Sequence, residues 1–287
     1  MAREQVRKTY KLFVGGAFPR SESGRSYPVS DADGQFLANA AAASRKDVRD
    51  AVVAARAGWQ RWSAATPYNR GQVLYRVAEV MEGRRDQFVA EVARSEGLTR
   101  RQAGVVVDAA VDRWVWYAGW TDKLAAVHGN ANPVAGPFFT FSVPEPTGVV
   151  GVVAPGESSL LGLVCVLAPV LATGCSAVVL ASEARPLPAI TQAEVLATSD
   201  VPAGAANILT GSVSELAPWL ASHADVNGLD LTGVSDPDLA TSLEQAAAQT
   251  LTRVTRPDPD EDFSAVPGPA RMLAVLETKT VWHPKGR

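Results

Sequence analysis

Cysteine and histidine are scarce in this 287-residue sequence, which holds two and three copies respectively. Cys165 and Cys175 lie among small and apolar residues, so we expect both thiols to be buried and reduced, as is usual in the cytoplasm. The histidines, His128, His223 and His283, lack the close spacing of metal ligands. The sequence therefore predicts no metal site.

Long runs of one chemical character are also missing. Basic runs do not exceed two or three residues and the formal net charge is -3, so nucleic-acid binding has no electrostatic support. The longest apolar stretch, residues 160–171, is too short and too interrupted to span a bilayer. Residues 1–5 lack the apolar core of a signal peptide. We therefore expect a cytoplasmic protein without nucleic-acid or membrane partners.

The first half of the chain carries helical signals. Ser44 to Asp47 is similar to a capping box, and apolar residues repeat behind it at helical spacing. Gly97 is a plausible helix stop. Residues 12–18 suggest a short hairpin with a Gly-Gly turn. Further helices are expected over three segments, of which the last is a single long helix: residues 68–81, 86–95 and 102–127.

From Gly148 onward, short apolar runs alternate with helical segments. Continuous apolar runs are typical of strands that are buried on both faces. We expect strands at residues 149–153, 177–180, 206–209 and 228–231. The segments between the strands are expected to be helices: residues 159–172, 187–199 and 214–222. This order predicts an α/β fold with a doubly wound parallel sheet.

Two further strands are expected outside this alternation. Residues 138–143 alternate in polarity, with Phe139 and Phe141 on one face. At the end of the sequence, Leu276, Thr278, Thr280 and Trp282 alternate with the residues between them. Strands that are separated from a main sheet are marginal by themselves, and their edges invite pairing with another chain.

Four segments resemble the aldehyde dehydrogenase superfamily: residues 116–123, 145–155, 201–211 and 277–281. The resemblance implies a Rossmann-like, NAD-binding-type domain at residues 1–127 and 146–256. It also implies a small β oligomerisation arm at residues 128–145 and 270–287. Residues 257–269, which are rich in proline and acidic residues, are expected to be a linker that replaces the catalytic domain. In this respect the chain is similar to the second, non-catalytic unit of bidomain aldehyde dehydrogenases.

The chain departs from the family pattern where chemistry is expected. Gly156 and Glu157 stand where the family has a Trp-Asn pair, and a carboxylate cannot donate a hydrogen bond to an oxyanion. In residues 181–184 the lysine of the family's ribose-binding motif is missing, and its glutamate is displaced by one position. No cysteine follows Cys175, and the general-base segment is replaced near residues 251–255. We therefore predict no catalytic residue.

The dinucleotide loop is altered as well. Asp238 stands where the family has its second glycine, and Asp236 lies close by. These aspartates would repel a pyrophosphate, so the sequence favours an ordinary capped helix start at Ser235 or Asp236, with Pro237 in the first turn, over a cofactor site. The only cofactor-site residues that the resemblance leaves are a degenerate remnant: Ala154, Pro155, Gly211, Thr232 and Gly233. We expect no cofactor, or weak NAD binding at most.

The sequence leaves three functional hypotheses. The first is a non-catalytic subunit, structural or regulatory, that assembles with itself or with a complete aldehyde dehydrogenase. The second is an active NAD(P)-dependent aldehyde dehydrogenase, either alone or completed by a partner's catalytic domain. The third is a module that binds another ligand in the remodelled cofactor cleft. The residues expected to support assembly lie on the two arm strands: Phe139, Phe141, Leu276, Thr278, Thr280 and Trp282.

Overall fold

A computed structural model describes residues 8–286, so residues 1–5, on which the absence of a signal peptide was judged, lie outside the described part of the chain. Within this range the largest sheet has five parallel strands in the order β10-β9-β6-β7-β8. Its strands are β6 (Val149–Val153), β7 (Ser176–Leu180), β8 (Ala206–Leu209), β9 (Gly228–Asp230) and β10 (Arg253–Thr255). The predicted α/β fold with a doubly wound parallel sheet is confirmed. Strand β10 was not expected.

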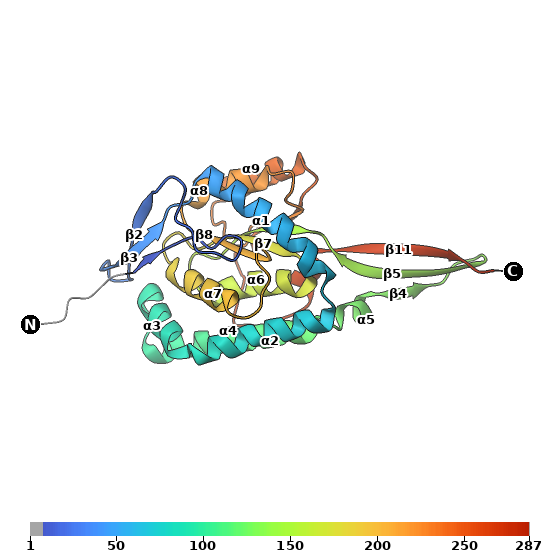
Figure 1. Cartoon of the computed structure of the whole chain (residues 1–287), viewed down its shortest axis with the longest axis horizontal. Helices are drawn as coiled ribbons and strands as arrows, with labels where there is room; N and C mark the ends of the chain where they lie inside the picture. The colour runs from blue at the N-terminus through green and yellow to red at the C-terminus, as the bar shows by residue number, and fades with distance from the viewer. Residues whose placement is uncertain (1–7, 287) are drawn as a thin grey trace, which may run out of the picture.

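Helices cover both faces of this sheet (Figure 1). Val149 and Val153 of β6 pack on the face that is covered by α1 (Arg45–Ala64), α8 (Val213–Ala221) and α9 (Pro237–Ala248). Val150 and Val152 point to the other face, because successive side chains of a strand alternate. That face is covered by the remaining large helices: α2 (Pro67–Gly83), α3 (Arg85–Glu96), α4 (Arg100–Trp120), α6 (Leu161–Thr173) and α7 (Leu187–Ala197).

Local capping signals position the helices of the first half. Ser44 caps α1 in a complete capping box, in which Asp47, three residues after the N-cap, bonds back to the backbone N–H of Ser44. Gly97 ends α3 in the left-handed conformation, with φ 69°. The prediction of one long helix over residues 102–127 is wrong, because α4 ends at Trp120 and a separate helix, α5 (Leu124–His128), follows. The hydroxyl of Thr121 donates to the Ala118 carbonyl over 3.0 Å, and the tighter bonding of this turn ends the helix.

A small sheet at the N-terminal side was not expected. It consists of β1 (Thr9–Tyr10), β2 (Ser26–Ser30) and β3 (Phe36–Ala41) in the order β1-β3-β2. The chain between β1 and β2 turns at Gly15 and Gly16, and Val14 and Ala17 bond to each other across this turn. Phe13 pairs with Ile208 at the edge of the main sheet, so this region is tied to the body of the protein.

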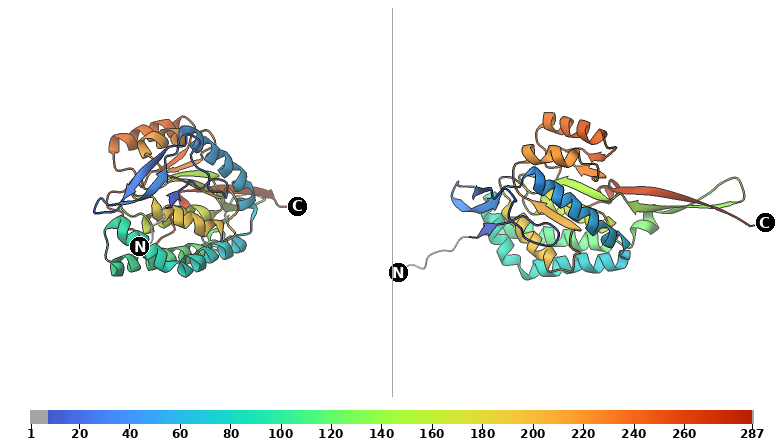
Figure 2. Two further views of the ribbon diagram at one scale, coloured as in Figure 1. Left: turned by 60° about the vertical axis from the view of Figure 1, so that its left-hand side comes forward. Right: turned by 45° about the horizontal axis from the view of Figure 1, so that its top comes forward.

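A three-stranded antiparallel sheet projects from the body of the protein (Figures 1 and 2). We call it the arm, and it consists of β4 (Asn130–Asn132), β5 (Phe138–Pro146) and β11 (Leu276–Pro284). β11 pairs with β5 along its whole length, from Leu276 opposite Pro146 to Pro284 opposite Phe138. Leu276, expected at an interface, is instead buried against the body at the base of the arm.

Residues 256–275, which we call the strap, connect β10 to β11. They contain one short helix, α10 (Ala270–Leu273), and otherwise turns. Arg271 donates to Asp230 and Thr232 over 3.2 Å each and pairs with Glu261 at 2.9 Å. Arg113 of α4 donates to two carbonyls of the strap. The strap is thus fixed to the end of β9 and to α4. No helix in the described part is long and apolar enough to cross a membrane.

Replacing Arg271 with Met should lower the free energy of unfolding by about 3–5 kcal/mol, because the buried Asp230 carboxylate loses its cation. Burial raises the pKa of Asp230, so the unpaired carboxyl is tolerated when protonated. The variant's stability should therefore fall as the pH rises from about 4 towards 8. Urea denaturation at both pH values measures this.

Arg100→Met is the matched control, because Arg100 forms an exposed ion pair with Asp86. It should change the stability by less than about 1 kcal/mol. Equal losses in Arg271→Met and Arg100→Met would contradict a structural role for the buried pair.

Candidate functional site

The carboxyl ends of β6, β7 and β9 lie side by side in the main sheet. From β6 the chain proceeds to β7 and β8 on one side, and then returns to place β9 on the other side of β6. Ligands of open α/β sheets bind outside the carboxyl ends of the strands at this switch point. The candidate site therefore consists of the loops that follow these strands: residues 154–157, 181–185 and 231–236.

Four of the five predicted remnant residues come together at this point. Ala154 and Pro155 follow β6, and Thr232 and Gly233 follow β9, the strand beside it. Gly211 follows β8 and lies away from them, since β7 separates β8 from β6. There, Gly211 adopts φ 142° and packs close to the backbone of Ala43.

Gly233 is required by packing between two loops. Its backbone N–H donates to the Val153 carbonyl over 2.9 Å. A Cβ atom at this position would lie 2.1 Å from the Ala154 carbonyl oxygen, closer than any real contact. The glycine therefore allows the loop after β9 to approach β6, which explains it without a nucleotide.

The side chain of Thr232 is already engaged within the protein. Its hydroxyl and its backbone N–H both donate to the Asp230 carboxylate, and Arg271 donates to the same hydroxyl. Thr232 thus belongs to the network that holds the strap.

Acidic side chains line the loops where an anionic ligand would have to bind. Glu157 is exposed and pairs with Arg185, which also donates to the Glu157 carbonyl. Glu183 accepts a hydrogen bond from the backbone N–H of Val213, over 3.1 Å, at the start of α8. A carboxylate accepts hydrogen bonds and cannot donate one to an oxyanion.

The N-terminus of α9 is capped by its own side chains. Asp236 is the N-cap and accepts a hydrogen bond from the Asp238 backbone N–H over 2.9 Å, while Pro237 occupies the first turn. The predicted capped helix start is confirmed. The two carboxylates offset the partial positive charge at the N-terminus of α9, and they would repel a phosphate group there.

Both cysteines are buried and unpaired, as expected. Burial raises the pKa of the Cys165 thiol to about 11, and the nearby Arg113 and Arg271 only partly offset this. The Cys175 thiol donates to the Val275 carbonyl over 3.4 Å, at the junction of the strap and the arm. A thiol that stays protonated is a poor nucleophile, so Cys165 is not activated for catalysis.

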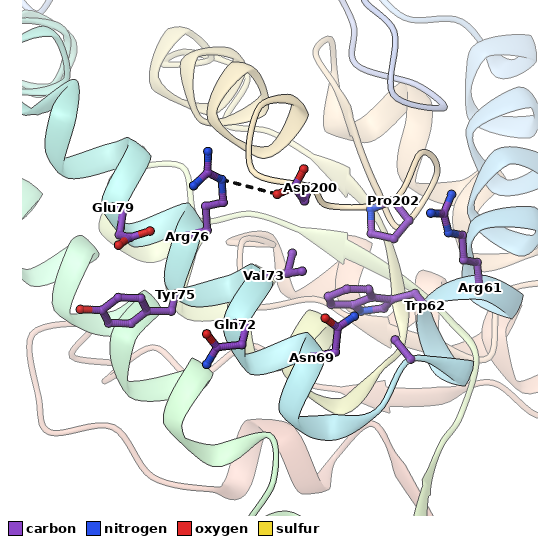
Figure 3. A pocket seen from close by; sticks show the side chains of 11 residues that line it. Arg61, Trp62, Asn69, Gln72, Val73, Tyr75, Arg76, Glu79, Asp200 and Pro202 are labelled. Atoms are coloured by element: carbon purple, nitrogen blue, oxygen red, sulfur yellow. Dashed lines mark ion pairs between the residues drawn. The ribbon is translucent and has the colours of Figure 1, made fainter.

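A surface groove of about 580 Å³ lies between α2 and the loop that precedes β8 (Figure 3). Arg76 and Asp200 form an ion pair across it at 3.5 Å, but their side chains are 53% and 79% exposed. The groove also lies near the amino end of β8, away from the carboxyl ends of the strands. Its charges are solvated, so we do not assign a site to it.

Sequence reasoning missed Arg113 and Arg271, the two cations that hold the strap. Each partner of Arg113 lies at least 150 positions away, and Asp230 lies 41 positions from Arg271. A proline-rich segment followed by one arginine gives no local signal of such contacts.

Gly233→Ala should destabilise the protein by about 1–3 kcal/mol, because the added methyl group meets backbone rather than a movable side chain. Gly156→Ala is the matched control in the neighbouring loop, where nothing lies within 4 Å of a new Cβ. Thermal unfolding of the two variants measures the difference. A Gly233→Ala protein as stable as Gly156→Ala would show that the loop is not packed in this way.

Cys165 should react with iodoacetamide about two orders of magnitude more slowly at pH 7.5 in the folded protein than in urea. The reason is that its pKa is raised to about 11 from an unfolded value of about 8.5. Labelling should accelerate as the pH approaches 11, and peptide mass spectrometry separates Cys165 from Cys175. Rapid labelling of native Cys165 would indicate an activated thiol.

Comparison with known proteins gives the family. A protein-family model described as "Aldehyde dehydrogenase family" matches residues 18–256 of the chain. The match ends where the strap begins. The chain is 32% identical over 257 residues to retinal dehydrogenase 2 of Gallus gallus, covering 86% of this chain and 48% of that one. It is 30% identical over 253 residues to cytosolic aldehyde dehydrogenase 1 of Elephantulus edwardii, covering 85% and 49%.

Among solved structures, the HpcC protein of Thermus thermophilus superposes with a TM-score of 0.81 at 29% identity, covering 86% of this chain and 47% of that one. The chain thus spans about half the length of the relatives that it matches. The extent of the family match and the agreement of the folds show that this chain belongs to the aldehyde dehydrogenase family.

Proposed function

We propose that this chain is a non-catalytic member of the aldehyde dehydrogenase family, which acts as a structural or regulatory subunit and assembles with itself or with a complete aldehyde dehydrogenase. The observation that carries the proposal is the pairing of β11 with β5. The strap leads from β10 directly into β11, so the arm is complete although the segment between them is only 20 residues long, 256–275.

The chemistry of the carboxyl-end loops supports a non-catalytic role. Aldehyde oxidation through a covalent intermediate requires a thiolate nucleophile and donors for the oxyanion. Here both thiols are buried, and that of Cys165 is held protonated at neutral pH. Glu157 offers a carboxylate in place of a donor.

The same loops argue against tight cofactor binding. A pyrophosphate at the start of α9 would meet Asp236 and Asp238, whose carboxylates already serve the helix end. Glu183 is bonded to the start of α8. NAD would therefore bind weakly at most.

The arm carries the surface for assembly. Phe139 and Trp282 are 49% and 59% exposed although both are large and apolar. Phe139 contacts Phe141 with ring centroids 5.8 Å apart, whereas Trp282 contacts Phe138 at 5.7 Å. Aromatic clusters of this kind dominate the energetics of interfaces.

The polar residues of β11 have a second role. The hydroxyl groups of Thr280 and Ser142 are hydrogen-bonded at 2.8 Å, and Lys279 pairs with Glu145 at 3.1 Å. Thr278 lies opposite Pro144. These contacts hold the arm rigid, and the outer edge of β11 remains for strand pairing with another chain.

Trp282→Ala should weaken self-association at least about tenfold while leaving the thermal unfolding of the body unchanged, because burying one large aromatic side chain contributes about 1.5–3 kcal/mol. Sedimentation equilibrium over a concentration series measures the association. Trp219→Ala is the matched control, since Trp219 is 40% exposed on α8 and lies far from the arm.

The same variants test assembly with a complete family member. The wild-type chain should co-purify with a co-expressed complete aldehyde dehydrogenase, and Trp282→Ala should lose this association. A strictly monomeric wild-type chain that also fails to co-purify would overturn the proposal. NADH formation from an aldehyde by the purified chain alone would favour an enzyme instead.

A further inference from the structure

A cavity of about 420 Å³ lies between the strap and the helices α4 and α6. Its floor carries Arg113 and Tyr117 of α4 together with Cys165 of α6. Phe263 and Val266 of the strap line it from the other side. The cavity borders the candidate site at Thr232, but most of its lining comes from the strap and from α4, and none of it comes from the loops after β6 and β7.

Arg113 enters the cavity with an incompletely satisfied charge. The residue is only 6% exposed, and its Nη2 atom donates to the carbonyls of Phe263 and Ala265 over 2.8 and 2.9 Å. Its Nε–H is buried and has no hydrogen-bond partner among residues 8–286. In contrast to Arg271, which pairs with Asp230 and Glu261, Arg113 has no ion pair in this part of the chain. A buried cation without a paired anion is costly, so the site favours a negative ligand.

Tyr117 supplies a second free donor on the same helix face. It lies four residues after Arg113, a spacing that brings side chains together on a helix. The residue is 2% exposed and lines the cavity, and within the described range no hydrogen bond to its hydroxyl is made. Burial raises the pKa of Tyr117, so the hydroxyl remains a neutral donor.

The remaining wall limits the ligand to one negative charge. Asp258, Glu261 and Asp262 line the cavity together with Arg256 and Arg271, and the three carboxylates would repel a doubly charged phosphate more strongly than a singly charged group. Phe263, Val266 and the protonated Cys165 offer apolar contact. A ligand that fits both features has a singly charged group that accepts two hydrogen bonds and an apolar tail.

We propose that this cavity binds a small monocarboxylate with an apolar tail. The carboxylate accepts hydrogen bonds from Arg113 Nε–H and the Tyr117 hydroxyl, and the tail packs against Phe263 and Val266 of the strap. The ligand would hold the strap against α4 through the arginine that already contacts it. This inference does not depend on the assembly proposed above.

Isothermal titration calorimetry of the full chain with benzoate and hexanoate tests the proposal, with benzamide, hexanol and inorganic phosphate as comparison probes. The two carboxylates should give saturable binding, and the neutral probes and phosphate should bind at least tenfold more weakly. Tyr117→Phe should weaken benzoate binding about tenfold or more, because one hydrogen bond to a charged group is lost. Tyr75→Phe is the matched control, since Tyr75 is exposed on α2 and outside this cavity.

A second measurement uses the unmodified protein. Benzoate should slow the alkylation of Cys165, which lines the cavity, and leave that of Cys175 unchanged. The proposal is overturned by absence of saturable carboxylate binding, by equal binding of benzamide or phosphate, by unchanged affinity in Tyr117→Phe, or by binding that does not protect Cys165.

Discussion

The ion pair between Arg271 and Asp230 is the interaction on which the position of the strap, and therefore of β11, depends. Asp230 is the last residue of β9 and is buried, and Arg271 reaches it from the strap. Burial of two charges costs desolvation energy, which only a well-placed partner offsets. Glu261 and Thr232 supply the additional hydrogen bonds that make the arrangement tolerable. The pair therefore specifies where the strap lies, more than it stabilises the fold as a whole.

The placement of the strap decides what the rest of the chain can form. It brings the chain from β10, at one edge of the main sheet, to the base of the arm, where Leu276 is buried and β11 begins. From there β11 pairs with β5 over nine residues. The strap also closes over Arg113, Tyr117 and Cys165, and so creates a cavity that neither the helices nor the sheet would form without it.

The loops at the carboxyl ends of the strands keep the geometry of a dinucleotide-binding sheet but carry different charges. Gly233 still allows the close approach of the loop to Ala154. Around it, Asp236 and Asp238 cap α9, and Glu183 bonds the start of α8. These loops can therefore keep the packing of a dinucleotide-binding sheet without binding a dinucleotide. The packing needs only a small residue at Gly233, whereas phosphate binding needs hydrogen-bond donors that are still free.

The sequence by itself determined the alternation of buried strands and helices, the caps at Ser44 and Gly97, a capped helix start at Ser235 or Asp236, and the two long arm strands. These features follow from the polarity and conformational preferences of neighbouring residues. Tertiary structure alone decided the end of α4, the short strands β1 to β4 and β10, the burial of Leu276, and the contacts of Arg113 and Arg271. Their causes are pairings between residues far apart in the chain, and local pattern carries no information about such partners.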